Sequence, residues 1–82
     1  MLVVELYGVL QQVAGGKTLE LAGVEAGDTV ADALERLRRE VPALEGHLPR
    51  LACAQGERLV RRDHVIDPGR PLVLLPPVSG GA

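Results

Sequence analysis

The residues with the most specific chemistry lie at the end of the chain. An apolar run over residues 72–75 is followed by Pro76, Pro77, Val78, Ser79, Gly80, Gly81 and Ala82. Because prolines fix φ and lack an N–H, Pro76 and Pro77 are expected to end a strand and begin a stiff tail. Glycines have no Cβ, so another protein's backbone can approach them closely. We therefore expect a domain over residues 1–75 and a tail over residues 76–82 that threads into a partner's active site.

The other side chains capable of chemistry are isolated from one another. His47 and His64 have no second His, Cys or paired carboxylate at ligand spacing, so we expect no metal site. Cys53 lies in an apolar stretch and is expected to be a core residue rather than a redox group. The sequence has no Ser/His/Asp arrangement and no phosphate-binding glycine loop. Outside the tail, the sequence therefore predicts no catalytic centre.

The composition restricts the partners of the chain. The 82 residues include nine basic and eleven acidic residues, giving a net charge of −2, and a single aromatic residue, which is a tyrosine. This balance argues against broad nucleic-acid binding, which relies on a basic surface. The first residues of the sequence lack the basic and then apolar pattern expected of a secretory signal, and no apolar run approaches the roughly 18 residues of a membrane span. We expect one cytoplasmic domain with neither nucleic-acid nor membrane partners. The arginines expected on its solvated surface are Arg36, Arg38, Arg39, Arg61 and Arg62.

One main helix is expected after two strands. Strands are predicted over residues 2–7 and 17–22, with a helical turn over residues 8–14 between them. Thr29 is a good N-cap, and Asp32, three residues later, completes a weak capping box. The helical stripe that follows consists of Val30, Ala33, Leu34, Leu37 and Val41, and Pro42 ends the helix.

The second half of the chain predicts three more strands. After an irregular connection over residues 43–49, short strands over residues 50–54 and 58–60 flank a turn at residues 55–57. The final strand, residues 72–75, is apolar on both faces, which indicates a central position beside the first strand. The predicted fold is α+β, a β-grasp in which a mixed sheet of about five strands wraps around one main helix.

A single helix covers one face of such a sheet, so the other face needs an explanation. The apolar residues expected on that face are Val3, Tyr7, Val73 and Leu75. Contiguous exposed apolar area usually marks an interface. We expect these residues to dock a partner, and we expect Leu75→Glu to weaken the binding of that partner.

The last twenty residues closely resemble the small subunit of molybdopterin synthase. The resemblance lies in Asp63-His64-Val65-Ile66, Asp67-Pro68-Gly69, the apolar strand and Pro-Pro-Val-Ser-Gly-Gly. The segment from Tyr7 to Gly15 also resembles that family's first strand and helical turn. The family consists of ubiquitin-like sulfur carriers, which implies a carrier that is not an enzyme on its own but is the small subunit of one.

The resemblance implies a reaction at Gly81. A ubiquitin-activating-type enzyme would use ATP to adenylate the glycine carboxylate, and sulfur would replace the adenylate to give a thiocarboxylate. The tail would then enter the large subunit of molybdopterin synthase, where the sulfur passes to the dithiolene of a pterin precursor. The carrier itself would bind no cofactor. Gly80 would provide clearance at the threaded tip.

Ala82 departs from the family pattern, which ends at the second glycine. One further residue adds about 3.3–3.6 Å of extended reach, and its Cβ would enter a channel shaped for glycine. We expect that a protease removes Ala82 before activation or that the form carrying it is inactive. The segment over residues 52–57 also lacks the asparagine that relatives often have near this turn.

Other functions remain open at this point. Within the same class, the chain could carry sulfur for thiamine synthesis or tRNA thiolation, or serve as a ubiquitin-like protein tag. In a different class, it could be a plain β-grasp interaction module without tail chemistry. Pro76 and Pro77 favour the synthase subunit, which they resemble most.

Overall fold

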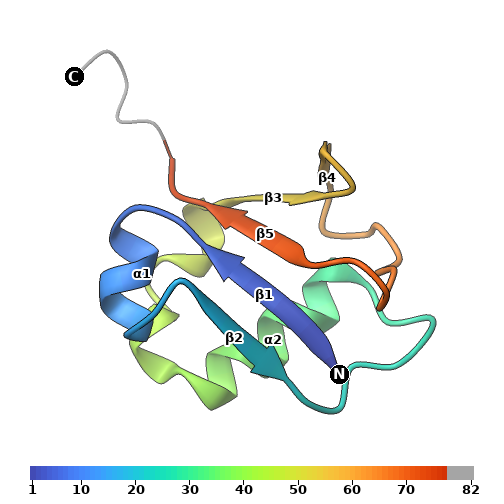
Figure 1. Cartoon of the computed structure of the whole chain (residues 1–82), viewed down its shortest axis with the longest axis horizontal. Coiled ribbons are helices and arrows are strands. Elements are labelled where there is room, and N and C mark those ends of the chain that lie inside the picture. The colour runs from blue at the N-terminus through green and yellow to red at the C-terminus, as the bar shows by residue number, and fades with distance from the viewer. Residues whose placement is uncertain (78–82) are drawn as a thin grey trace.

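The computed structural model describes residues 1–77, which form a five-stranded mixed sheet with helices on one side (Figure 1). The β-grasp fold predicted from the sequence is confirmed. In order along the chain, with η marking a 3-10 helix, the elements are β1 (Leu2–Leu6), α1 (Val9–Ala14), β2 (Thr18–Leu21), α2 (Val30–Glu40), η1 (Pro42–Leu44), η2 (Leu48–Arg50), β3 (Ala52–Gln55), β4 (Arg58–Val60) and β5 (Leu72–Leu75).

The last strand lies in the middle of the sheet, as predicted. The strand order is β2-β1-β5-β3-β4. Strands β1 and β5 are parallel, with Leu6 paired to Leu74, whereas the other neighbouring strands are antiparallel. β5 can occupy this position because all four of its residues are apolar, so neither face has to remain in water. The parallel pairing also places the carboxyl ends of β1 and β5 at the same edge of the sheet.

Helix α2 begins at the capping box predicted from the sequence. Thr29 Oγ1 accepts a hydrogen bond from the Asp32 backbone N–H at 3.2 Å, and Asp32 Oδ2 accepts one from the Thr29 N–H at 2.9 Å. The bond from the Thr29 backbone, followed by that from its hydroxyl, lowers the pKa of the Asp32 carboxyl. Because a lowered pKa means that folding favours the ionised form, this contribution is present above the ordinary carboxyl pKa and is lost on acidification. The helix ends before Pro42, as expected.

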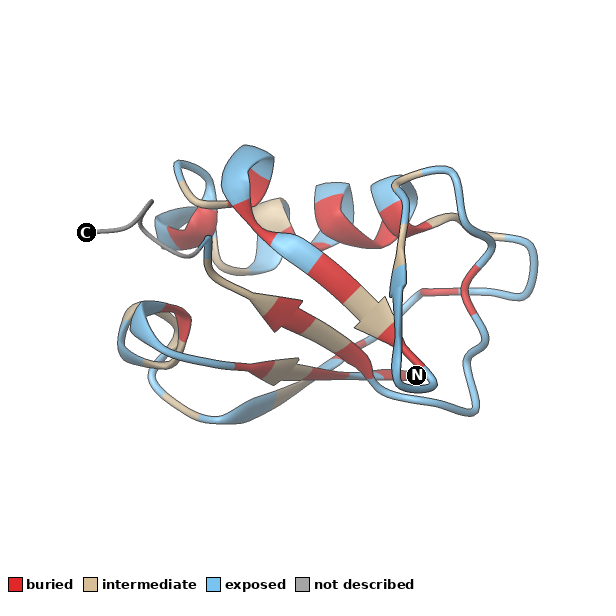
Figure 2. Ribbon diagram, turned by 90° about the horizontal axis from the view of Figure 1, so that it is seen from above, coloured by how far each residue is buried: buried red, intermediate tan, exposed pale blue. Residues whose placement is uncertain are grey.

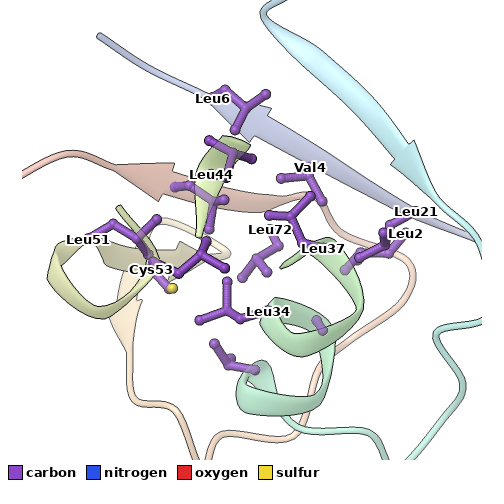
Figure 3. Packing of buried hydrophobic residues seen from close by; sticks show 14 of the residues in the cluster. Leu2, Val4, Leu6, Leu21, Leu34, Leu37, Leu44, Leu51, Cys53 and Leu72 are labelled. Atoms are coloured by element: carbon purple, nitrogen blue, oxygen red, sulfur yellow. The ribbon is translucent and has the colours of Figure 1, made fainter. Parts of the chain in front are cut away.

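The core lies between α2 and one face of the sheet. Figure 3 shows Leu34 and Leu37 of α2 packed among sheet residues such as Leu72. Along β1, Leu2 and Val4 are buried whereas Val3 is exposed, and this alternation is typical of a sheet covered on one side. The fully buried residues of the core include Leu2, Val4, Leu6, Leu10, Leu21, Val30, Leu37, Leu44, Cys53, Leu72 and Leu74.

The connection between α2 and β3 is more regular than the sequence predicted. It contains the two 3-10 helices η1 and η2, each with a proline in its first turn, where no N–H is required. These short helices bury Leu44 and Leu48 against the core. A three-residue helix is too short to show a hydrophobic period, so the sequence pattern indicated only an irregular segment.

Gln55 is the buried polar side chain among residues 1–77, and the sequence placed it in a turn. It ends β3 instead, and the turn consists of Gly56 and Glu57, both at positive φ. Its Nε2 donates to the carbonyl oxygens of Asp67 and Arg70 at 2.8 and 3.0 Å, and its Oε1 accepts from the Asp67 N–H at 3.0 Å. This amide therefore attaches the turn that precedes β5 to β3.

Replacing Gln55 by alanine is expected to lower the free energy of unfolding by about 1–3 kcal/mol, because a backbone N–H and two carbonyls lose their partner. Denaturant unfolding of the purified protein measures this change. Gln12→Ala is the matched control, since Gln12 is exposed on α1 and should change stability by less than about 0.5 kcal/mol. Equal stabilities of the two variants would show that the Gln55 amide contributes nothing.

Candidate functional site

The residues that follow the central strand β5 are the predicted start of the tail. β5 ends at Leu75, as predicted, and the half-buried Pro76 is followed by the exposed Pro77. The remaining residues assigned a threading or reactive role, Val78, Ser79, Gly80 and Gly81, lie outside the described residues, as does Ala82. The division into a domain over residues 1–75 and a tail over residues 76–82 therefore stays a prediction.

The four residues predicted to dock a partner share one face of the sheet, because they alternate with the buried residues of β1 and β5. Figure 2 shows buried positions alternating with more exposed ones along the strands. Val3 and Tyr7 are exposed on β1 and just beyond it, and Tyr7 is 46% exposed. Val73 and Leu75 lie on β5 and are half-buried. Because β1 and β5 are paired neighbours, side chains from opposite ends of the chain form one apolar surface.

Sequence reasoning missed three members of this surface. Ala52 and Ala54 of β3 pair with Leu75 and Val73, and Leu59 of β4 pairs with Ala54. Leu59 is 73% exposed, the most exposed large hydrophobic residue of the described chain. The period-2 alternation around Cys53 was the signal that could have placed them there. We call the seven residues the docking face: Val3, Tyr7, Ala52, Ala54, Leu59, Val73 and Leu75.

One acidic side chain lies within the docking face. Glu5 is on β1 between Val3 and Tyr7, and its neighbour across the β1–β5 pair is Val73. The Tyr7 hydroxyl donates to Glu5 Oε1 at a long 3.4 Å. A partner for this face therefore needs an apolar surface with a hydrogen-bond donor or a cation opposite Glu5.

The sequence predicted an exposed Arg62, and this prediction is wrong. Arg62 is half-buried, and its guanidinium donates to the backbone carbonyls of Leu48 and Leu51 at 2.9 and 3.0 Å. Leu48 begins η2 and Leu51 directly follows it, so Arg62 ties this 3-10 helix to the segment that follows β4. Arg61 is exposed, as expected.

Cys53 is buried, as predicted, at 1% exposure. Burial raises the pKa of its thiol, with a smaller opposing effect from Arg62. Because the reactive form of cysteine is the thiolate, a raised pKa makes this side chain a poor nucleophile at neutral pH. Arg62 Nη1 donates to the Cys53 sulfur at 3.5 Å, while its Nη2 donates to the two carbonyls. Cys53 is therefore a packing residue.

The charged side of α2 is a network of exposed ion pairs. Arg38 pairs with Glu35 and with Glu45, and Arg39 also contacts Glu35. A shallow hollow between α2 and η2 is lined by Glu35, Arg38 and Glu45 together with Leu34 and Leu48. The hollow brings together no nucleophile and base, and its charges are already paired. The prediction of a solvated helix face is confirmed for Arg36, Arg39 and the partly exposed Arg38.

Residues 1–77 contain no cluster of three His, Cys, Asp or Glu side chains able to hold a metal ion. Within the same residues, no helix is long and apolar enough to cross a membrane. The described residues present an exposed, largely apolar face of the sheet, and β5 ends beside it.

Comparison with known protein families gives one match that covers most of the chain. The model of the ThiS family matches residues 4–81, so the match ends at Gly81 and leaves out Ala82. No curated protein sequence matches the chain.

Solved structures of similar fold come from an archaeon. The chain resembles the crystal structure of SAMP1 from Haloferax volcanii with a TM-score of 0.84 and 30% sequence identity, over 98% of each chain. It also resembles the crystal structure of H. volcanii small archaeal modifier protein 1 with a TM-score of 0.80 and 27% identity, over 94% of this chain and 97% of the other.

Proposed function

Because the chain belongs to the ThiS family of ubiquitin-like β-grasp sulfur carriers, we propose that it carries sulfur as a Gly81 thiocarboxylate for molybdopterin synthesis. The observation that carries this proposal is the family match that ends at Gly81, within the predicted tail that begins at Pro76 and Pro77. The tail begins at the central strand β5, beside a broad apolar docking face. A partner that binds this face would lie next to the base of the tail.

The proposed chemistry has two steps. The Gly81 carboxylate, freed from Ala82 by hydrolysis of the peptide bond between them, attacks the α-phosphorus of ATP. An acyl adenylate forms and pyrophosphate leaves. A sulfur nucleophile at the oxidation level of hydrosulfide then attacks the acyl carbon. AMP is expelled, and a thiocarboxylate is formed. Adenylation is needed because a free carboxylate is a poor electrophile, and the product sulfur is a better nucleophile than the original oxygen.

The proposed partners are an adenylating enzyme of the ubiquitin-activating type and the large subunit of molybdopterin synthase. Each would have to bind the docking face and receive the tail, so the two are expected to compete. The proline-proline-valine-serine-glycine-glycine ending supports molybdopterin as the destination over thiamine or thiolated tRNA. Deleting the gene should then abolish molybdoenzyme activity while cells still grow without added thiamine; the reverse pattern would assign the sulfur to thiamine.

The docking role predicts that Leu75→Glu weakens binding of the adenylating enzyme about tenfold or more, because a charge would be buried without a partner. Titration calorimetry measures the affinity, and circular dichroism establishes that the variant is folded. Val65→Glu is the matched control, since Val65 is equally apolar and 54% exposed but lies in the loop that pairs with Thr29, outside the sheet. A folded Leu75→Glu variant with unchanged affinity would refute the docking role.

The intact mass of the protein purified from its own cells tests the carrier function. The expected species lacks Ala82 and has one oxygen replaced by sulfur. Alkylation with iodoacetamide at mildly acidic pH should modify this species and leave the buried Cys53 thiol unmodified, which locates the sulfur. An unmodified mass that keeps Ala82 in cells actively making molybdopterin would contradict the proposal.

A second function is favoured by the names of the similar structures, one of which is a small archaeal modifier protein. In this alternative, the lysine amine of another protein attacks the activated Gly81 carbonyl and displaces AMP, forming an isopeptide bond. Trypsin cleaves after Arg62 but spares the Arg70–Pro71 bond, so it would leave residues 63–81 on the target lysine. A Ser79→Arg variant shortens this remnant to Gly-Gly, which mass spectrometry detects. Gly-Gly-modified lysines found only with this variant would favour the tag.

A further inference from the structure

The base of the tail touches the turn that follows the first strand. Leu6 pairs with Leu74 in the parallel β1–β5 ladder. Two positions further along the chain from each of these residues, Gly8 and Pro76 lie side by side. Pro76 is half-buried at this contact although it is already beyond the last residue of β5. In Figure 1 the chain segment that links β1 to α1 lies at the same edge of the sheet as the end of β5.

Gly8 leaves no room for a side chain. Its backbone has φ 59° and ψ −136°, a conformation that glycine adopts readily and other residues avoid. A Cβ at this position would lie 2.9 Å from Cγ of Pro76 and 3.8 Å from its Cδ. The Pro76 ring is fused to its own backbone and cannot rotate away. A side chain at position 8 would therefore have to displace the Pro76 ring, by a change of its pucker or by a shift of the backbone at the base of the tail.

The other close glycine contacts of residues 1–77 differ in kind. A Cβ at Gly23 would meet the guanidinium of Arg36 at 2.7 Å, and one at Gly56 would meet that of Arg70 at 2.7 Å. Both neighbours are the ends of flexible side chains, which can swing aside. Gly8 is thus the position within the described chain where a glycine lies in close contact with a rigid group of the tail.

We propose that the Gly8–Pro76 contact is a positioning pair that sets the direction in which the tail leaves the domain. The importance of this contact rests on the proposed carrier function, in which the tail must reach a partner's active site while the docking face is bound. Pro76 has a restricted φ, and its ring packs on a surface without a side chain. The contact therefore orients Pro76 and Pro77 relative to the sheet before a partner binds, which lowers the ordering cost of insertion.

Adenylation kinetics separate this role from general stability. In chains ending at Gly81, Gly8→Ala is expected to lower kcat for ATP–pyrophosphate exchange at least about tenfold, because a misdirected tail places the carboxylate wrongly. KM should change little, since the docking face is intact. Gly15→Ala is the control: Gly15 also has a positive φ of 82°, but apart from Gly15 and its two chain neighbours no atom lies within 4 Å of where its Cβ would be. This control should keep the parent kcat.

The double variant Gly8→Ala/Pro76→Ala tests the contact itself. Removing the proline ring relieves the clash while the unfavourable φ at position 8 remains, so kcat should recover most of the way to that of Pro76→Ala alone. Purely additive losses would show that Gly8 matters only for its own backbone conformation and would overturn the pairing. A Gly8→Ala variant with parent kinetics would also overturn it.

A spin label gives a readout that does not depend on the proposed function. Attached to Ser79→Cys in the full chain, it should react selectively, because Cys53 is buried. The paramagnetic broadening of backbone amides should have a different pattern in Gly8→Ala but the parent pattern in Gly15→Ala. If no form of the chain supports pyrophosphate exchange, the proposed function fails while this pattern still tests the pair. Identical broadening in the parent and in Gly8→Ala would refute the positioning role.

Discussion

A chain ending at Gly81 is expected to support ATP–pyrophosphate exchange at least about a hundredfold faster than the chain ending at Ala82. The extra residue moves the carboxylate by about 3.3–3.6 Å, and a misplacement of even about 1 Å can cost a hundredfold in rate. The ThiS family match also stops at Gly81. The measurement is exchange of labelled pyrophosphate into ATP by the adenylating enzyme from the same cells.

Two further variants separate the effect of chain length on the exchange rate from the effect of a side chain on the last residue. A chain ending at position 81 with Gly81→Ala has the correct length but carries a Cβ at the reacting residue, and its rate reports the clearance that glycine provides. A chain from which Gly80 and Gly81 are both removed, together with Ala82, keeps the domain and should be inactive. Equal exchange by the chains ending at Gly81 and at Ala82 would eliminate processing as a requirement.

Leu74→Ala is expected to lower the free energy of unfolding by about 2–5 kcal/mol, the largest stability effect in our predictions. Leu74 is fully buried on the central strand, paired to Leu6 on one side and Cys53 on the other, so the cavity has little room to collapse. Small domains have only about 5–15 kcal/mol of stability in total. Guanidinium unfolding followed by circular dichroism measures the loss.

The same substitution at Leu59 provides the comparison. Leu59 is 73% exposed on the edge strand β4, so Leu59→Ala should change stability by less than about 0.5 kcal/mol. Losses of similar size at the two positions would contradict the assignment of the core to the helix-covered face of the sheet.

The fold was predictable because its signals are local. Helix α2 is specified by a hydroxyl and a carboxylate three residues apart, Thr29 and Asp32, and by an apolar stripe of helical period. β5 is predicted as central by four consecutive apolar residues. Each of these patterns lies within one element, so it can be recognised in the sequence without knowing what packs against that element.

The candidate site was predictable only in part. The sequence placed Val3, Tyr7, Val73 and Leu75 on one face because strand alternation follows from the backbone itself. It missed Ala52, Ala54 and Leu59, because their membership of the face depends on how β3 and β4 pair with β5. The sequence also predicted an exposed Arg62 and a turn at Gln55, and both predictions were wrong. Both side chains bind backbone carbonyls that are distant in the sequence, and no local pattern identifies such partners.

By itself, the sequence determined the order of strands and helices, the capping of α2 and the proline-glycine composition of the tail, because propensity, periodicity and capping act between residues a few positions apart. Only the tertiary structure decided what surrounds the base of the tail. Gly8 and Pro76 lie near opposite ends of the chain, and no local pattern links them. They meet because the parallel pairing of β1 and β5 brings the carboxyl ends of both strands to one edge of the sheet.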